Sequence, residues 1–267
     1  MNELLFEPQE HREAARLLGE FLAEYETELH GRRVMPEIDR EAMRAILAEP
    51  FPEEGKGLDE LFQEFREVVV PNSTNVAHPR FLPYVLPSAN GISAIADALA
   101  STLNQNCNMW TLSPAANAIE QRVITWFQEL FSFPEGSGGI ITSGGSMANL
   151  SALAIARDTY LGDTARREGI QTRSSPLRLY LSDQVHNSSD KAAVILGLGL
   201  DHVRHIPCDE AFRMRMDLLK EAVLEDRRAG LSPFCVGGSA GTVTTGAIDP
   251  LDELADCCGE EGLWLHI

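Results

Sequence analysis

The chain has 267 residues, of which 44% are hydrophobic, and its formal net charge at pH 7 is −18. This length suffices for one large domain or two smaller ones, and the hydrophobic fraction is that of a folded globular protein rather than a disordered chain. The negative charge argues against nucleic acid and anionic membranes as partners, because both repel an acidic protein.

Several kinds of segment are missing from the sequence. It contains no apolar run of about 18 or more residues, so it predicts no membrane-spanning helix. Its first residues, Met1 to Glu7, lack the basic region and apolar stretch of a secretory signal. The five cysteines show neither metal-ligand spacing nor a disulfide framework. We therefore expect a cytoplasmic protein with reduced thiols and no metal site; the cysteines are Cys107, Cys208, Cys235, Cys257 and Cys258.

The first 88 residues have helical patterns and no strand pattern. Apolar residues recur at helical spacing from Leu17 to Tyr25, and further helices are predicted over 41–47 and 58–70. The Pro- and Gly-rich residues 50–57 separate the last two. We predict that residues 1–88 form a helical N-terminal arm.

From residue 89 onward, helical and strand patterns alternate. This alternation predicts βαβ units, and hence an α/β domain over 89–267 with a mainly parallel sheet and helices on both faces. Active sites of such sheets lie beyond the carboxyl ends of the strands, where residues 143–146, 183–186 and 240–245 fall. The predicted helices lie near 91–104, 115–131, 146–161, 187–198, 214–228 and 250–260, and the predicted strands near 139–142, 177–182, 203–207, 234–239 and 263–267.

A glycine turn, Ser143-Gly144-Gly145-Ser146, joins the predicted strand 139–142 to the helix 146–161. Free backbone N–H groups and the positive end of a helix dipole suit such a turn to a phosphate. The turn has neither a Walker lysine nor the G-x-G-x-x-G spacing, which favours a cofactor smaller than a nucleotide. The turn also approaches the nucleophile elbow of α/β-hydrolases, so an alternative is a hydrolase with Ser146 as nucleophile and His202, His205 or His266 as base.

Five further segments occur in a fixed order around this turn. With it they closely resemble the pyridoxal-phosphate-dependent group II amino acid decarboxylases, a family that includes the aromatic amino acid, histidine and glutamate decarboxylases. The likeness runs from about Arg33 to the last residue. The segments are His78-Pro79-Arg80-Phe81, Trp110-Thr111-Leu112-Ser113-Pro114-Ala115, residues 182–192, residues 241–250 and Leu263-Trp264-Leu265-His266-Ile267.

The resemblance implies pyridoxal 5′-phosphate as cofactor and a fold type I large domain in a homodimer, with the 1–88 arm as the dimerisation segment. It implies that Gly145 and Ser146 hold the phosphate, with Thr242 as a further contact. His186 matches the histidine that stacks on the cofactor ring beside the substrate carboxylate, for which a flat hydrogen-bond donor is suited. The alternative for His186 is a strand-end histidine satisfied by the backbone. Val243 departs from the family, which usually has threonine there.

The substrate pocket is less well specified. By resemblance, Tyr84 and Trp110 line it, and the alternative is that both are ordinary core aromatics. Val85 replaces a phenylalanine that is common in the aromatic decarboxylases, so we expect a pocket of different width. An aromatic L-amino acid is the preferred substrate, with glutamate or a diamino acid as alternatives. Asp249, before Pro250, is predicted to cap the next helix.

The family's Schiff-base lysine and the aspartate that pairs with the pyridine nitrogen lie after the segment that matches 263–267. None of Lys56, Lys191 and Lys220 matches the required position. We therefore expect the N-terminal part of a longer enzyme, inactive alone, or one piece of a split enzyme completed by a separate C-terminal polypeptide. A carbon–carbon lyase of the same fold and a non-catalytic assembly fragment are the remaining alternatives.

Overall fold

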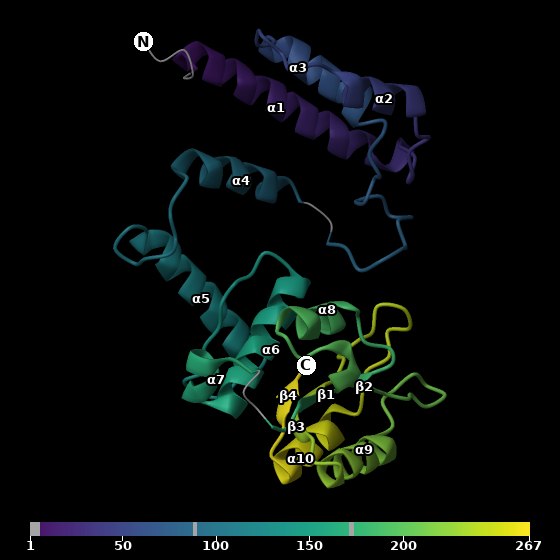
Figure 1. Cartoon of the computed structure of the whole chain (residues 1–267). Helices are drawn as coiled ribbons and strands as arrows, with labels where there is room; N and C mark the ends of the chain where they lie inside the picture. The colour runs from purple at the N-terminus through teal and green to yellow at the C-terminus, as the bar shows by residue number, and fades with distance from the viewer. Residues whose placement is uncertain (1–5, 88–89, 171–173) are drawn as a thin grey trace. The chain divides into compact units, whose positions relative to one another are not determined.

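The computed structural model describes residues 6–87, 90–170 and 174–267 (Figure 1). The chain forms two compact units, Met1–Gln105 and Asn106–Ile267. The sequence pattern predicts the domain boundary between residues 88 and 89, which lie outside the described residues. The contacts of the structure group the next helix, up to Gln105, with the first unit. The role of residues 1–88 as a dimerisation segment stays a prediction.

The first unit is helical, and no strand occurs among its described residues. It contains α1 (Pro8–Glu28), η1 (Leu29–Gly31), α2 (Arg40–Ala48), α3 (Leu58–Glu64) with its π-helical continuation η2 (Phe65–Val69), and α4 (Gly91–Leu103). Local sequence explains where the helices begin: Glu7 and Glu10 form a capping box at α1, and the Asp39 side chain accepts from the first N–H groups of α2. The helices predicted in this region are confirmed.

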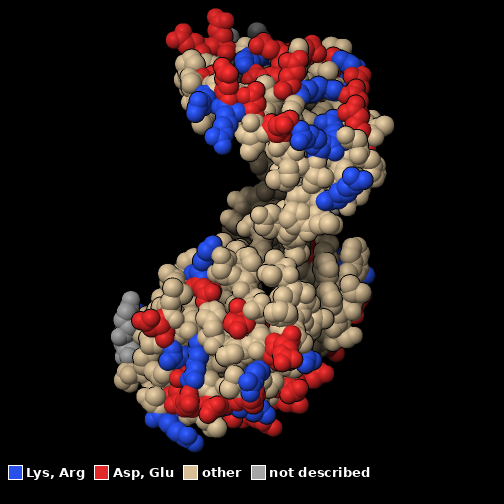
Figure 2. Space-filling view, turned by 90° about the vertical axis from the view of Figure 1, so that its right-hand side faces the viewer, with Lys and Arg blue, Asp and Glu red and all other residues tan. Residues whose placement is uncertain are grey.

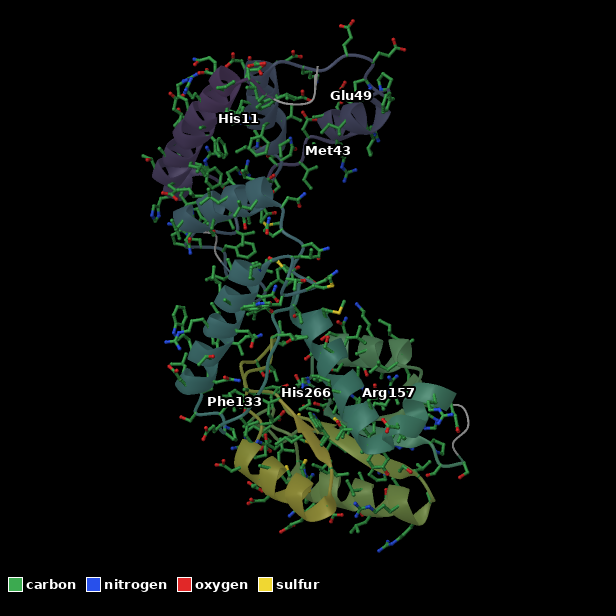
Figure 3. The ribbon with its side chains drawn as sticks, turned by 90° about the vertical axis from the view of Figure 1, so that its left-hand side faces the viewer. His11, Met43, Glu49, Phe133, Arg157 and His266 are labelled. Carbon is green, nitrogen blue, oxygen red and sulfur yellow. The ribbon has the colours of Figure 1, made fainter. Side chains whose placement is uncertain are left out.

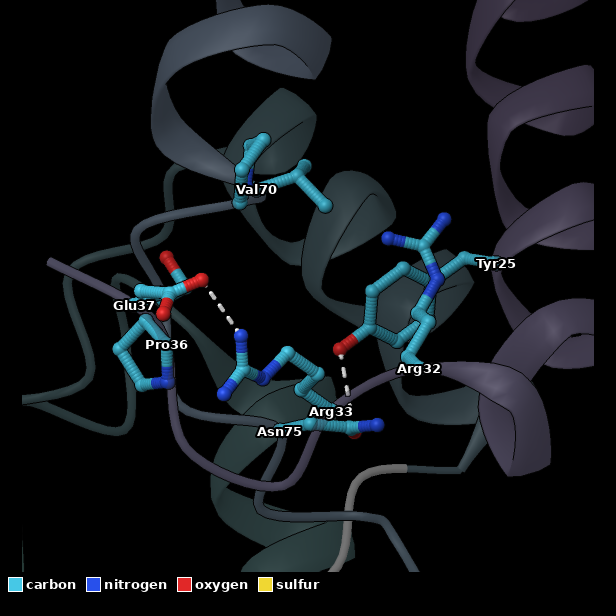
Figure 4. A pocket seen from close by; sticks show the side chains of 9 residues that line it. Tyr25, Arg32, Arg33, Pro36, Glu37, Val70 and Asn75 are labelled. Carbon is cyan, nitrogen blue, oxygen red and sulfur yellow. Dashed lines mark hydrogen bonds and ion pairs between the residues drawn. The ribbon is translucent and has the colours of Figure 1, made fainter. Parts of the chain in front are cut away.

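Ring packing and ion pairs hold the first unit together. The rings of Phe21 on α1 and Phe65 on η2 meet edge to face, with centroids 5.3 Å apart. On the face drawn in Figure 2, acidic and basic side chains are mixed over these helices; Arg16, for example, pairs with both Glu13 and Glu20. Some of the acidic side chains are thus paired locally with basic ones. A surface pocket of about 330 Å³ in this unit is lined by Tyr25, Arg32 and Val70, among other residues (Figure 4).

The second unit is an α/β domain. Its helices are α5 (Pro114–Leu130), α6 (Gly145–Leu161), α7 (Asp163–Glu168), α8 (Ser188–Ile195), η3 (Leu200–His202), α9 (Met216–Arg228) and α10 (Leu251–Glu261). Its strands, β1 (Leu177–Ser182), β2 (Val203–Ile206), β3 (Ser232–Gly237) and β4 (Trp264–His266), form one parallel sheet in the order β2-β1-β3-β4. This is the expected fold type I α/β architecture.

Each face of the sheet has its own core. Leu179 and Leu181 of β1 belong to one cluster, which includes Leu153 of α6 and Ala192 of α8. Tyr180, between them, points to the other cluster, which contains residues of α9 and α10. The alternation of side chains along a strand produces this division. Helices therefore cover both faces, as the βαβ pattern predicts.

Two sequence expectations are wrong. Residues 139–142 form no strand: Ile140 and Ile141 are exposed, and the N–H of Ile141 donates to Glu120 Oε1 at 3.0 Å instead of to a neighbouring strand. An apolar run becomes a strand only where another strand pairs with it. Asp249 does not cap α10, whose N-cap is Pro250; its buried carboxylate accepts from Met214 N at 2.7 Å and Ser239 N at 2.8 Å. Helix α7 was not foreseen.

Among the described residues, no helix combines the length and the apolar character that crossing a lipid bilayer requires.

Candidate functional site

The N-terminus of α6 presents unpartnered donors to an open space. The first N–H groups of any α-helix lack partners inside the helix, and here the N-cap, Gly144, has no side chain to supply one and no acidic residue lies in the first turn. Gly145 and Ser146, the first two helical residues, are exposed. A Cβ built on Gly145 meets no heavy atom within 4 Å. Donors, dipole and room are thus present for an anion such as a phosphate monoester.

His186 lies in the turn after β1, and its exposed ring is held from one side. The backbone N–H of Ser188 donates to His186 Nδ1 at 3.2 Å, and the Ser188 hydroxyl oxygen lies 2.9 Å from the same atom. A backbone N–H can only donate, so Nδ1 is the acceptor and the neutral ring carries its proton on Nε2. The ring therefore presents an N–H donor on its free edge.

A polar chain connects this histidine to α6 and to β4. Asn149 Nδ2 donates to Ser188 Oγ at 2.8 Å, and Asn149 Oδ1 lies 2.9 Å from His266 Nε2. Asn149 stands three and four residues after Ser146 and Gly145, on the same side of the helix. The structure thus connects His186 to the N-terminal part of α6, and His266, labelled in Figure 3, lies at the end of β4 beside that helix.

The environment of His266 sets its protonation. Burial lowers the pKa of His266, because the charged imidazolium loses hydration in the interior. The ring is therefore neutral at pH 7. A neutral imidazole carries one proton, and the proton on Nε2 is the one that Asn149 Oδ1 accepts.

Asp183 and Cys208 fix the turn that carries His186. Cys208 N donates to Asp183 Oδ2 at 3.3 Å, and Ser182 Oγ lies 3.1 Å from Cys208 Sγ. The hydrogen bond from the Cys208 thiol lowers the pKa of Asp183. Burial, and then the neighbouring Asp183, raise the pKa of Cys208 to about 11. This thiol stays protonated at pH 7, so it acts as a structural donor and not as a nucleophile.

Thr242 is buried in the turn that follows β3. Its hydroxyl lies 2.7 Å from Thr245 Oγ1, its N–H donates to Ala247 O at 3.0 Å, and its carbonyl accepts from Gly246 N at 2.8 Å. These bonds hold the turn closed on itself. A contact between Thr242 and a phosphate stays a prediction.

Tyr84 and Trp110 are not core aromatics, because their side chains are 78% and 58% exposed. Tyr84 belongs to the first unit and has a φ of +66°, in the left-handed region that residues other than glycine seldom adopt. Trp110 belongs to the second unit. Their place in a substrate pocket stays a prediction.

Sequence reasoning assigned no role to Asn149 and Ser188, although Ser188 stands inside the segment 182–192 and Asn149 in the helix that follows the glycine turn. Ser188 is 39 residues from Asn149, and His266 is 117 residues from it. No local pattern marks such pairs. The available signal was the polar amide of Asn149 in the second turn of α6, among mostly small and apolar residues.

The hydrolase alternative has no geometric support in the described part of the chain. A nucleophile and its base need hydrogen-bond reach of each other. His205 Nε2 lies instead 3.0 Å from Asp190 Oδ1, and His266 is bonded to Asn149. Among the described residues, the buried Nδ1 of His202, the third candidate base, has no hydrogen-bond partner, and none of the three imidazoles is hydrogen-bonded to Ser146. Within the described residues, moreover, no cluster of three or more His, Cys, Asp or Glu is placed to hold a metal ion.

Comparison with known proteins identifies the family of this arrangement. Residues 41–267 match the model of the pyridoxal-dependent decarboxylase conserved domain. The aromatic-L-amino-acid decarboxylase of Bacillus atrophaeus is 35% identical over 97% of this chain and 52% of its own length. The chain thus spans about half the length of the curated relatives it matches.

Solved structures agree. Rhodiola rosea 4-hydroxyphenylacetaldehyde synthase superposes with a TM-score of 0.89 at 29% identity, over 98% of this chain and 56% of that one. Oryza sativa TDC, solved with PLP and tryptamine, superposes with a TM-score of 0.87 at 29% identity, again over 98% of this chain and 56% of that one.

Proposed function

Because the chain belongs to the pyridoxal-dependent decarboxylase family, we propose that the protein of which it forms part decarboxylates an L-amino acid with pyridoxal 5′-phosphate as cofactor. The observation that supports the proposal is the set of hydrogen bonds that connects His186, through Ser188, to Asn149 in the second turn of α6. An anion-binding helix end and a flat donor ring then belong to one site.

The start of α6 fits the phosphate of this cofactor. The N–H groups of Gly145 and Ser146, with the Ser146 hydroxyl, would hold it, because the helix end offers donors, a positive dipole and no competing acidic side chain. The open space over Gly145 admits a ligand close to the backbone. Thr242 is a weaker part of this proposal, since its hydroxyl already pairs with Thr245.

Pyridoxal phosphate, when bound, supplies an electron sink for the pair of electrons left by the departing carboxylate. The residues of this polypeptide would orient the substrate and the cofactor. His186 would lie against the cofactor ring, with its Nε2–H directed at the substrate carboxylate. A neutral donor at that place positions the carboxylate without forming a fixed ion pair that opposes loss of CO₂.

An aromatic substrate is supported by the name of the Bacillus relative and by the tryptamine in the Oryza sativa structure. Tyr84 and Trp110 would line its pocket. Glutamate or a diamino acid is the alternative, and an aldehyde product is suggested by the Rhodiola relative. A carbon–carbon lyase remains a further candidate within the fold, whereas nothing here supports a separate C-terminal polypeptide or a purely structural role.

The test uses the full-length protein. It should be yellow, borohydride should fix the colour to the polypeptide, and CO₂ should be released faster from aromatic L-amino acids than from glutamate or diamino acids. His186→Ala should lower this release by roughly a hundredfold or more, the contribution of a positioned donor or acid, and leave the cofactor bound.

His205→Ala is the matched control, since it removes an exposed imidazole of the same unit that is bonded to Asp190. It should leave turnover unchanged. Equal turnover in His186→Ala and His205→Ala would remove the role given to His186. A colourless protein that hydrolyses an activated ester, and loses this activity in Ser146→Ala, would overturn the decarboxylase proposal.

A further inference from the structure

We propose that Asn149 and Ser188 are positioning residues that fix the tautomer and ring orientation of His186 and link it to His266. The part that concerns turnover rests on the proposed function, whereas the part that concerns the tautomer does not.

The four side chains come from four separate places in the second unit. His186 is in the turn after β1, Ser188 begins α8, Asn149 is in the second turn of α6 and His266 ends β4. Their successive polar distances are 2.9, 2.8 and 2.9 Å. Ser188 is 3% exposed, so water does not compete for its hydroxyl. Such a chain is stable only if each donor faces an acceptor.

The donors and acceptors run in one direction. His266 Nε2–H donates to Asn149 Oδ1, and Asn149 Nδ2 donates to Ser188 Oγ. The hydroxyl proton of Ser188 is then free to reach His186 Nδ1, which already accepts from the backbone N–H of Ser188. Both bonds to His186 need an unprotonated Nδ1. The proton of the neutral ring is thereby held on Nε2.

Reversing the Asn149 amide would break this order. Nδ2 would then face His266, and Oδ1 would take the Ser188 hydroxyl proton away from His186. His186 would keep only the backbone bond of 3.2 Å. The amide of asparagine is therefore needed as donor and acceptor at once, a combination that an aspartate carboxylate cannot supply because it only accepts.

The consequence for function is orientation of a donor. With Nδ1 held by Ser188, the ring cannot rotate about its Cβ–Cγ bond without losing both bonds, because the rotation would put the carbon Cδ2 where Nδ1 now accepts. Nε2–H then points to the exposed edge, where the substrate carboxylate is proposed to lie. Loss of the hydrogen bonds that connect His266, Asn149 and Ser188 to His186 should reduce turnover. It should leave the phosphate contacts at Gly145 and Ser146 in place.

The experiment uses the full-length protein with ¹⁵N-labelled histidine, with and without pyridoxal phosphate. Long-range ¹H–¹⁵N correlation spectra report which ring nitrogen carries the proton. We expect the Nε2–H form for both His186 and His266. Asn149→Asp and Ser188→Ala should give mixed tautomers at His186 and lower kcat roughly tenfold, the effect of one hydrogen bond, with KM and cofactor content little changed. Ser188→Thr, which keeps the hydroxyl, should restore the single tautomer.

Ser189→Ala is the matched control, because Ser189 is a neighbouring buried serine, 2% exposed. Its hydroxyl takes no part in the series of hydrogen bonds from His266 to His186. It should change neither tautomer nor kcat. An Nδ1–H form of His186 in the unsubstituted protein would overturn the proposal, and this measurement needs no variant to fold. A single Nε2–H form that persists in both Asn149→Asp and Ser188→Ala would also overturn it. If His186 and His266 show the Nε2–H form but the protein has no decarboxylase activity, the proposed function is wrong and the proposal about the tautomer stands.

Discussion

At Gly145, the effect of a substitution on stability can be separated from its effect on cofactor binding. It is the first residue of α6, and a Cβ there meets nothing within 4 Å in the chain itself. Gly145→Ala should therefore leave the free energy of unfolding unchanged or raise it by up to about 1 kcal/mol, because alanine restricts the unfolded chain more than glycine does. If a phosphate lies against this backbone, the added methyl group should weaken cofactor binding roughly tenfold or more.

Two measurements check this: urea unfolding of the cofactor-free, full-length protein, and titration with pyridoxal phosphate followed by absorbance. Gly259→Ala is the matched control, since Gly259 lies in α10 with the same open space around it. It should give the stability change without the loss of affinity. Equal cofactor affinity in the two variants would place the phosphate elsewhere.

At the scale of elements, α6 is the part on which the site depends. It carries Gly145, Ser146 and Asn149, and it is fixed to the sheet by Leu153, which is fully buried in the cluster with Leu179 and Phe234. Leu153→Ala should lower the free energy of unfolding by about 2–5 kcal/mol, through lost burial and the cavity left behind. Denaturant unfolding of the full-length protein measures this change.

Ile155→Ala serves as the control for Leu153→Ala. Ile155 is on the same helix but 53% exposed, so its truncation should cost within about 0.5 kcal/mol. Similar costs for both variants would show that α6 does not pack on the sheet through Leu153.

The same scale shows why element prediction succeeded in one place and failed in another. Helix α6 begins and ends within a residue of the range expected from its glycine turn and apolar spacing, because these signals are local. The strand expected at 139–142 was wrong, since its apolar residues say nothing about which strand would pair with them. Its backbone is bonded to Glu120 of α5 instead.

At the scale of the whole molecule, the exposed apolar stripe of α4 bears on assembly. Ile92, Ile95, Leu99 and Leu103 follow helical spacing and are 70%, 50%, 61% and 67% exposed. A stripe of this kind needs a cover. We predict that a second copy of the protein covers this stripe in a homodimer; α4 begins just after residues 1–88, the segment to which the resemblance assigns dimerisation.

Leu99→Arg in the full-length protein should therefore weaken the dimer by roughly thirtyfold or more, the effect expected of a central interface residue. Sedimentation over a range of concentrations measures the dissociation constant. Ser101→Arg, on the opposite side of α4, is the control and should leave the constant unchanged. A monomeric unsubstituted protein, or equal constants for the two variants, would contradict a dimer built on this stripe.

The sequence by itself determined the family, the α/β architecture, the positions of most helices and the segments that carry the chemistry. These follow from local signals: periodicity, turn residues and the order of motifs along the chain. Only the tertiary structure decided which side chains meet. The chain from His266 through Asn149 and Ser188 to His186, the bracing role of Asp249 and the absence of a strand at 139–142 all depend on partners far away in sequence. Hydrogen bonds and strand pairing are formed in space, and a local pattern specifies what a residue can offer but not what it will meet.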